Sequence, residues 1–259
     1  LLVTLAAVVP TGGGPSRADL PTPRPAHAAR TAAADRLVVV ESFMRDICPN
    51  CAGVGELLDV LEAEYDSSEV LILEHDSDNR KGERYSRWVV SGGASTSLPL
   101  TMIDSGHWAF GGPVESAEVL RQAIDAARLR PPLAEVRATT ARARDSLTVT
   151  VQLRNLSQTR LDARANLAAA HAILYEPDRV HILRRFVRAV ASAPLETALE
   201  PGEAGAMELR LGPLSGMDWD NTRLLVLADY RPGASGPFDL LQATDMELPV
   251  EQRHAPTVD

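Results

Sequence analysis

The chain of 259 residues has few cysteines, almost no lysine and no long apolar segment. The two cysteines, Cys48 and Cys51, are too few for a disulfide-rich scaffold or a four-cysteine zinc site. Lys81 is the only lysine, which we interpret as a coding bias toward arginine. The apolar run at residues 1–10 is too short to span a bilayer.

Acidic residues also outnumber basic residues, by 35 to 26. The net charge is -9 and the pI is about 5.2, which argues against a nucleic-acid partner, because binding to phosphates needs a basic face. Hydrophobic residues make up 45% and charged residues 24%, as in soluble globular proteins. This composition argues against a mostly disordered, collagen-like or multi-pass membrane protein. We find neither a glycine-rich phosphate loop after a strand nor a serine-nucleophile elbow.

The amino-terminal region predicts export from the cytoplasm. Residues 1–10 carry no charge and are typical of a signal-peptide core that lacks its positive leader. Residues 11–35 are rich in glycine, proline and alanine, so residues 1–35 are predicted to be a signal-peptide remnant and a disordered linker. We expect a periplasmic or extracytoplasmic protein, either released or tethered to the membrane by this segment.

Residues 36–130 predict an α/β domain. Strands are expected at 36–44, 69–75, 100–104 and 107–110, and helices at 49–65, 76–91 and 113–130. The 49–65 segment has apolar residues at helical spacing, and Pro49 suits the first helical turn, where its missing N–H costs nothing. Ser105 and Gly106 are expected to form a hairpin turn.

Residues 131–251 have the character of an all-β domain, and 252–259 form a tail. Pro131 and Pro132 end the preceding helix and mark the boundary. Short apolar segments separated by turn residues follow, and in 146–153 apolar and polar residues alternate with the period of a half-buried strand. Strands are expected at 136–143, 146–153, 163–175, 180–190, 206–211, 222–230 and 240–248. We expect an antiparallel β-sandwich.

The two cysteines lie in the order strand, Cys-x-x-Cys, helix. Cys48 is expected at the amino end of the helix, where free N–H groups and the helix dipole favour a thiolate. Only a thiolate attacks a disulfide, so Cys48 is the predicted nucleophile. Cys51 lies one helical turn further on and is the predicted resolving thiol.

Around this motif the chain resembles the thioredoxin superfamily, over residues 36–130. The resemblance is carried by the segments VVVESF at 38–43, CPNC at 48–51 and LPLT at 98–101. It implies that Pro99 is cis and lies against the dithiol, and that the Leu98 backbone pairs with a bound substrate strand. The expected fold class is thus an α/β thioredoxin-like domain followed by an all-β antiparallel sandwich, which resembles immunoglobulin-like domains only in architecture.

Two positions differ from the family's pattern. The family usually has tryptophan before the first cysteine, where this chain has Ile47. Thioredoxin has a buried aspartate six residues before that cysteine, where this chain has Ser42. Glu41 is the neighbouring acid, but strand alternation directs it to the opposite face. The sequence therefore does not predict a proton relay to Cys51. Arg45 and Asp46 would have opposite effects on the Cys48 thiol.

The predicted function is that of an exported thiol–disulfide oxidoreductase whose partners are protein dithiols or disulfides of the cell envelope. No cofactor and no metal is predicted. One alternative is a non-catalytic binding or structural protein with a scaffold disulfide. Another is a Cu(I)-binding chaperone, because two thiolates suit Cu(I), with His107 as the candidate third ligand. Haem attachment needs histidine after the second cysteine, and Ala52 stands there.

Other polar residues have structural interpretations. His75 ends a strand and is expected to bond to the backbone, while His107 is expected to pack in a hairpin. His171 and His181 could face each other across a hairpin, without an obvious third metal ligand. Four arginines predict a charged edge strand that blocks aggregation, namely Arg179, Arg184, Arg185 and Arg188.

Overall fold

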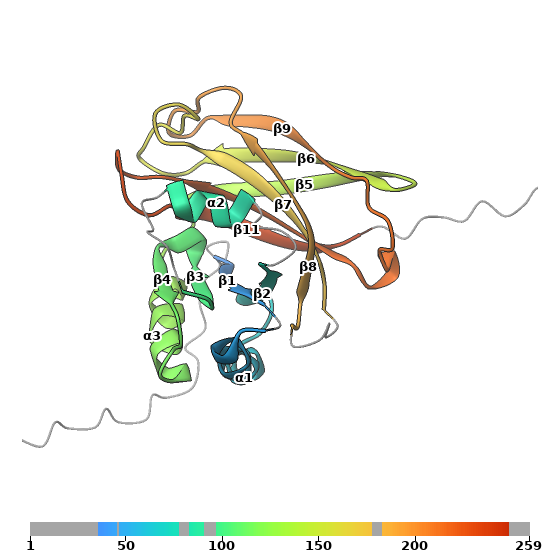
Figure 1. The fold of residues 1–259 in the computed structure, drawn as a ribbon. Helices are drawn as coiled ribbons and strands as arrows, with labels where there is room; N and C mark the ends of the chain where they lie inside the picture. The colour runs from blue at the N-terminus through green and yellow to red at the C-terminus, as the bar shows by residue number, and fades with distance from the viewer. Residues whose placement is uncertain (1–35, 46, 78–82, 91–96, 178–182, 249–259) are drawn as a thin grey trace, which may run out of the picture. The chain divides into compact units, whose positions relative to one another are not determined.

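The computed structural model describes residues 36–45, 47–77, 83–90, 97–177 and 183–248 (Figure 1). They belong to one compact unit, Ala34–Asp259. The expected signal-peptide remnant, the linker and the tail lie outside the described residues, as do Asp46, Lys81, Arg179 and His181. Within the described part of the chain, every helix is too short or too polar to cross a membrane.

Four strands and three helices form the first half. The helix predicted at 76–91 begins only at Glu83 and the one predicted at 113–130 at Ala117, while the other elements lie close to the predicted positions. Strand β1 is buried at all seven positions, because helices cover one face and other strands cover the opposite face. The strands are β1 (Val38–Met44), β2 (Val70–Asp76), β3 (Leu100–Ile103) and β4 (Trp108–Gly111). The helices are α1 (Pro49–Glu64), α2 (Glu83–Val90) and α3 (Ala117–Arg128), and a 3-10 turn, η1 (Asp104–Gly106), joins β3 to β4.

Seven strands form the second half. In β6 the residues Leu147, Val149, Val151 and Leu153 are buried, as the alternating pattern predicts. The strands are β5 (Ala134–Ala143), β6 (Ser146–Asn155), β7 (Ala169–Glu176), β8 (Phe186–Pro194), β9 (Ala204–Leu211), β10 (Arg223–Tyr230) and β11 (Asp239–Glu247), with a 3-10 turn, η2 (Trp219–Asn221). Strands β7 and β8 begin six residues later than predicted.

The strands of both halves join in one mixed sheet of eight, in the order β11-β10-β7-β8-β2-β1-β3-β4. The connection is a parallel pairing of β2 with β8 at a single residue pair, Glu74 and Phe186. The predicted fold class, an α/β thioredoxin-like domain followed by an all-β antiparallel sandwich, is therefore wrong. Strands β7, β8, β10 and β11 do not form a separate sandwich, because they continue the sheet that holds β1 and β2.

Three of the four apolar cores among the described residues hold these layers together. Helices α1 and α3 pack on one face of β1 and β2, in the core that contains both cysteines. The opposite face of β1 and β2 packs against β7, β10 and β11, with Leu37, Val39 and Leu73 against Ile173 and Leu227. The third core lies between the remaining face of β7 and β10 and a three-stranded sheet of order β5-β6-β9. Each half thus supplies apolar surface that the other half needs.

Candidate functional site

The two cysteines form a disulfide at the start of helix α1. Cys48 is the N-cap residue in an extended conformation, and Pro49 occupies the first turn. The Cys48 N–H donates to the Arg45 carbonyl over 3.3 Å, and the Cys51 N–H donates to the Cys48 carbonyl over 3.1 Å. The Cα atoms of the two cysteines are 5.3 Å apart. The predicted strand, dithiol and helix thus occur in that order.

The two cysteines differ in their access to solvent. Cys48 keeps 7% of its surface exposed, whereas Cys51 is fully buried. The residues flanking Cys48 are open, with Ile47 80% exposed and Pro49 and Asn50 also at the surface. Cys48 is thus covered over most of its surface. Of the two, it is still the one that a partner can reach.

The loop before β3 brings Leu98 and Pro99 to the disulfide. The Leu98–Pro99 peptide bond is cis, the form that the resemblance implied. The Cys48 Sγ lies 3.7 Å from the Leu98 carbonyl oxygen. In the disulfide this sulfur has no proton to donate, so the contact becomes a hydrogen bond only when Cys48 is a thiol. The Gly112 N–H contacts the carbonyls of Ser97 and Pro99 over 2.9 and 2.8 Å, which holds the loop against β4.

Behind the cysteines, β1 presents a hydroxyl and not a carboxylate. Ser42 is buried, and its Oγ lies 3.2 Å from the Oγ1 of Thr101 on β3. Glu41 contacts groups on the other face of the strand, as alternation predicts. Glu41 therefore binds groups on the face away from the cysteines and is not positioned to relay protons to Cys51.

Those partners belong to a buried charge cluster that sequence reasoning missed. Arg84 of α2 binds the Glu41 carboxylate, with Nε 2.9 Å from Oε1, and its Nη1 lies 2.7 Å from Oδ2 of Asp229 on β10. Burial alone would raise the pKa of Glu41, but Arg84 and His75 lower it well below its ordinary value. An acid inside an apolar strand, as at Glu41 and Asp229, is a signal that a buried cation must exist.

Two histidines complete this cluster. His75 Nε2 lies 3.1 Å from Glu41 Oε1, and its ring stacks on Phe43 with centroids 4.4 Å apart, so the expected backbone bond is replaced by a carboxylate. His171 Nε2 lies 3.1 Å from Asp229 Oδ1, and its Nδ1 lies 2.6 Å from Ser192 Oγ. Burial lowers the pKa of His171 and Asp229 opposes that effect, with a net lowering.

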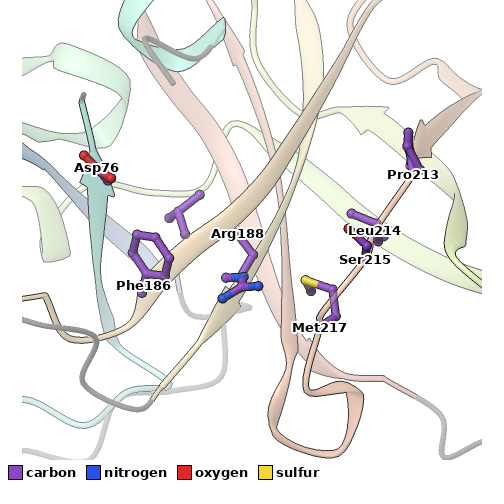
Figure 2. Close-up of a pocket in the computed structure, with 8 residues that line it drawn as sticks. Asp76, Phe186, Arg188, Pro213, Leu214, Ser215 and Met217 are labelled. Carbon is purple, nitrogen blue, oxygen red and sulfur yellow. The ribbon is translucent and has the colours of Figure 1, made fainter. Parts of the chain in front are cut away.

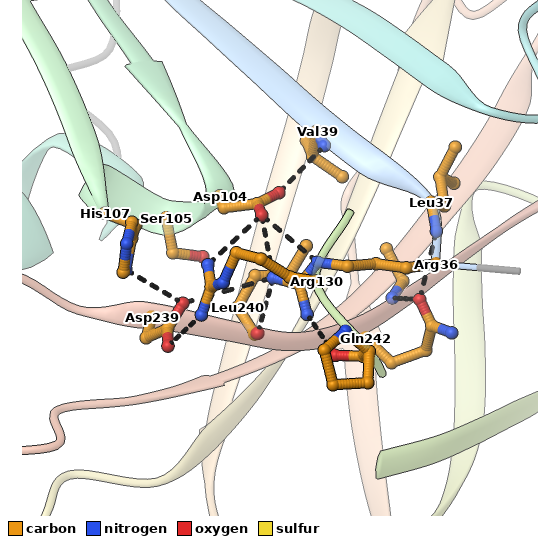
Figure 3. Close-up of polar contacts among 12 residues, drawn as sticks. Arg36, Leu37, Val39, Asp104, Ser105, His107, Arg130, Asp239, Leu240 and Gln242 are labelled. Atoms are coloured by element: carbon orange, nitrogen blue, oxygen red, sulfur yellow. Dashed lines mark hydrogen bonds and ion pairs between the residues drawn. The ribbon is translucent and has the colours of Figure 1, made fainter. Parts of the chain in front are cut away.

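A second cluster joins the start of β1 to β11 (Figure 3). Arg36 donates to Asp104 Oδ2 from Nη2 over 2.7 Å and to the Leu240 carbonyl over 2.9 Å. Burial raises the pKa of Asp104, although Arg36 opposes this. His107 Nδ1 lies 3.4 Å from Asp239 Oδ1, and its ring meets Trp108 with centroids 4.3 Å apart. His107, the candidate copper ligand, thus packs in the hairpin as expected and faces a carboxylate.

No three histidine, cysteine, aspartate or glutamate side chains among the described residues are placed to hold a metal ion.

The basic strand has a different role from the one expected. Arg188 lies on β8, inside the sheet between β7 and β2, so the prediction that this segment is an edge strand is wrong. Arg184 Nε lies 2.9 Å from Asp59 Oδ1, and Arg185 Nη2 lies 2.7 Å from Glu62 Oε1. Both acids belong to helix α1, so the arginines fasten the start of β8 to the helix that begins at Cys48.

A pocket of about 230 Å³ lies beside β8 (Figure 2). Its walls come from the end of β2, from β8 and from the segment after β9. The lining residues are Asp76, Phe186, Val187, Arg188, Pro213, Leu214, Ser215 and Met217. Arg188 donates to the Gly216 carbonyl from Nη2 over 3.0 Å, and its Nη1 lies 3.4 Å from Glu176 Oε2.

The comparisons with known proteins concern the fold alone. No family model matches the chain, and no curated protein matches it in sequence. Among solved structures, it is similar to HBP35 of Porphyromonas gingivalis, with a TM-score of 0.58 and 12% identity over 84% of this chain and 77% of that one. It is also similar to protein AGR_C_4864 of Agrobacterium tumefaciens, with a TM-score of 0.54 and 14% identity over 85% of this chain and 99% of that one.

Proposed function

We propose that this chain is an exported thiol–disulfide exchange protein, with Cys48 as the nucleophile and Cys51 as the resolving thiol. The observation that carries the proposal is the unequal access of the two sulfurs. Cys48 has an exposed edge at the amino end of α1, and Cys51 is buried one turn behind it. A partner can therefore form a bond only with Cys48. The resemblance of the CPNC and LPLT segments to the thioredoxin superfamily supports the same assignment.

In the reducing direction, the Cys48 thiolate attacks one sulfur of a partner disulfide. A bond forms between Cys48 and that sulfur, and the second partner sulfur leaves as a thiolate. The Cys51 thiolate then attacks Cys48 Sγ, the first partner sulfur leaves, and the disulfide seen here is formed. The partner gains two electrons and the dithiol loses two. The oxidising direction is the same sequence in reverse.

The surroundings of Cys48 give the other residues their proposed roles. The amide groups in the first turn of α1 favour negative charge on Cys48, because they have no partners within the helix. Leu98 offers its backbone beside the sulfur, and Pro99 positions that backbone. Pro99 is therefore a positioning residue, and Leu98 is the proposed contact for the partner's main chain.

The proposed partners are protein dithiols or disulfides outside the cytoplasm. A disulfide between neighbouring cysteines persists in oxidising compartments and is reduced by thiol systems in the cytosol. Blocking free thiols during cell lysis, followed by mass measurement, tests this location. We expect the oxidised chain in the envelope fraction, and a fully reduced cytosolic chain would contradict the proposal.

Trapping tests the exchange reaction itself. In the full-length chain with Cys51→Ser, the mixed disulfide on Cys48 is not resolved, so covalent adducts with envelope proteins should accumulate and disappear on reduction. The variant that carries Cys48→Ser as well as Cys51→Ser is the matched control and should trap nothing. If the single variant forms no adduct and purified wild-type protein exchanges with no dithiol probe, the proposal fails.

A second candidate is a scaffold whose disulfide is permanent. The 7% exposure of Cys48 favours it, because a covered sulfur is attacked slowly. Titration of the wild-type dithiol in glutathione buffers separates the two functions. A midpoint below about -300 mV is typical of a structural disulfide, and a higher midpoint of an exchanging one.

A further inference from the structure

The pocket beside β8 shares a wall with the core that holds the dithiol. Phe186 lines the pocket and packs against the apolar cluster that contains Cys48 and Cys51. Asp76, which also lines the pocket, ends strand β2 beside β8 and pairs in register with Met44, the last residue of β1 before the cysteine turn. The pocket and the disulfide thus lie at the same end of the parallel β1–β2 pair, the end where binding sites of α/β sheets gather.

Ion pairs hold the start of β8, which carries Phe186, against helix α1. The ion pairs of Arg184 with Asp59 and of Arg185 with Glu62 join the start of β8 to helix α1. Glu74 adds two contacts, since its carboxylate accepts from the Arg184 N–H and its own N–H donates to the Arg185 carbonyl. The pocket therefore keeps its position relative to the helix that begins at Cys48.

The size and chemistry of the pocket suit one side chain of a polypeptide. Its volume of about 230 Å³ is below the range of about 300–1,000 Å³ found for small-molecule and cofactor sites. Phe186 and Met217 offer apolar contact (Figure 2), and Val187 also lines the pocket. Asp76, Arg188 and Ser215 add polar groups to the lining, and the main chain of a peptide is itself polar.

We propose that this pocket is a substrate subsite, which receives an apolar side chain of leucine or methionine size from the segment that adjoins the cysteine attacked by Cys48. The inference rests on the proposed exchange function and adds a substrate class to it. Partner proteins are then selected by an apolar residue at a set distance from the reacting cysteine, in addition to their redox state.

Peptide probes test this subsite. The full-length Cys51→Ser chain, with Cys48 as a free thiol, is mixed with short peptides whose single cysteine is bonded to thionitrobenzoate. In one series a leucine moves residue by residue away from the cysteine, and in the matched series serine takes its place. We expect one leucine position to react about tenfold faster than its serine match, as burial of one apolar side chain predicts.

Two further substitutions locate the effect. Ser215 is exposed and lines the pocket, so Ser215→Trp in the same chain should fill the pocket mouth and abolish the leucine preference. Ser235 is exposed and outside the pocket, so Ser235→Trp should keep the preference. Equal rates for leucine and serine peptides, or a preference that survives Ser215→Trp, would overturn the subsite.

Glutathione disulfide separates the two proposals. It carries no apolar side chain of leucine size, so it should form an adduct with Cys48 equally in all three chains. If it reacts and no peptide shows a leucine preference, the subsite fails and the exchange function stands. If neither glutathione disulfide nor any peptide reacts, the exchange function fails and the subsite falls with it.

Discussion

Arg84 and Asp229 form a fully buried ion pair, with Nη1 and Oδ2 2.7 Å apart, although 145 residues separate them in the sequence. Arg84 lies on α2 and Asp229 on β10, so the pair joins the first half of the chain to the second. Glu41 binds the same guanidinium, and Arg87 binds the same aspartate. Partners on other elements thereby fix the positions of both the guanidinium and the aspartate carboxylate.

Loss of Arg84 should destabilise the fold strongly. In Arg84→Met the Glu41 and Asp229 carboxylates lose their shared cation inside the protein, and breaking such a pair costs about 3–5 kcal/mol. Urea unfolding of the wild type and the variant measures the change. Arg210→Ala is the control, because Arg210 is 80% exposed and should shift the free energy by less than about 0.5 kcal/mol. A similar small shift for Arg84→Met would contradict the assigned role.

Acid should destabilise the protein in two steps. The folded chain keeps His171 neutral because its pKa is lowered, so the unfolded chain binds a proton first as the pH falls below about 6.5. Glu41 and Asp229 also have lowered pKa values when folded, so their stabilising contribution is lost as the pH falls below about 4. Asp104 acts in the opposite direction, since burial raises its pKa.

Urea unfolding at a series of pH values checks this dependence. His171→Gln should flatten the stability curve between about pH 7 and 5 and leave the decrease below about pH 5, where the carboxylates protonate. A variant with the same slope as the wild type between these pH values would show that His171 does not titrate as described.

Reduction of the disulfide should cost little stability. The bond joins residues only three apart, and a loop this short removes little entropy from the unfolded chain. The expected loss is about 2 kcal/mol. Urea unfolding with and without a phosphine reductant measures it, and the chain with Cys48→Ser and Cys51→Ser should show no difference between the two conditions. A loss above about 5 kcal/mol would exceed the range for disulfides and favour a scaffold role.

The pairing of Arg185 with Glu62 should contribute a small coupling energy. Their side chains are 18% and 27% exposed, so water still screens the pair. A double-mutant cycle of Arg185→Ala and Glu62→Ala should give about 0.5–1 kcal/mol, decreasing at high salt. A coupling near zero would mean that these two groups do not fasten β8 to helix α1.

Local elements were predictable because their signals are local. The alternation of Leu147, Val149, Val151 and Leu153 gave the buried face of β6 correctly, and the spacing after Pro49 gave helix α1. The motif also identified four residues that the structure brings together, namely Cys48, Cys51, Leu98 and Pro99.

Strand partners were not predictable in this way. A strand's pattern tells which face is buried and does not name its neighbour, so the single pairing of Glu74 with Phe186 had no signal. One hint was present in the sequence of β7, AAHAILYE, which is almost entirely apolar, although a sandwich strand with an open face would alternate; all eight positions are buried in the structure. Likewise, an acid such as Asp229 in an apolar strand implies a cation, but the sequence does not indicate that Arg84 supplies it.

The core shared by β1, β2, β7 and β10 also determines when the protein can fold during its synthesis. Translation adds about 5–20 residues per second, so roughly 5–20 s pass between synthesis of α3 and of β10. Throughout that interval Leu37, Val39, Leu71 and Leu73 lack Leu227 as a packing partner, and in the first part of it they also lack Ile173. The nascent chain therefore presents an apolar surface that a chaperone can hold, and folding waits for strands near its carboxyl end.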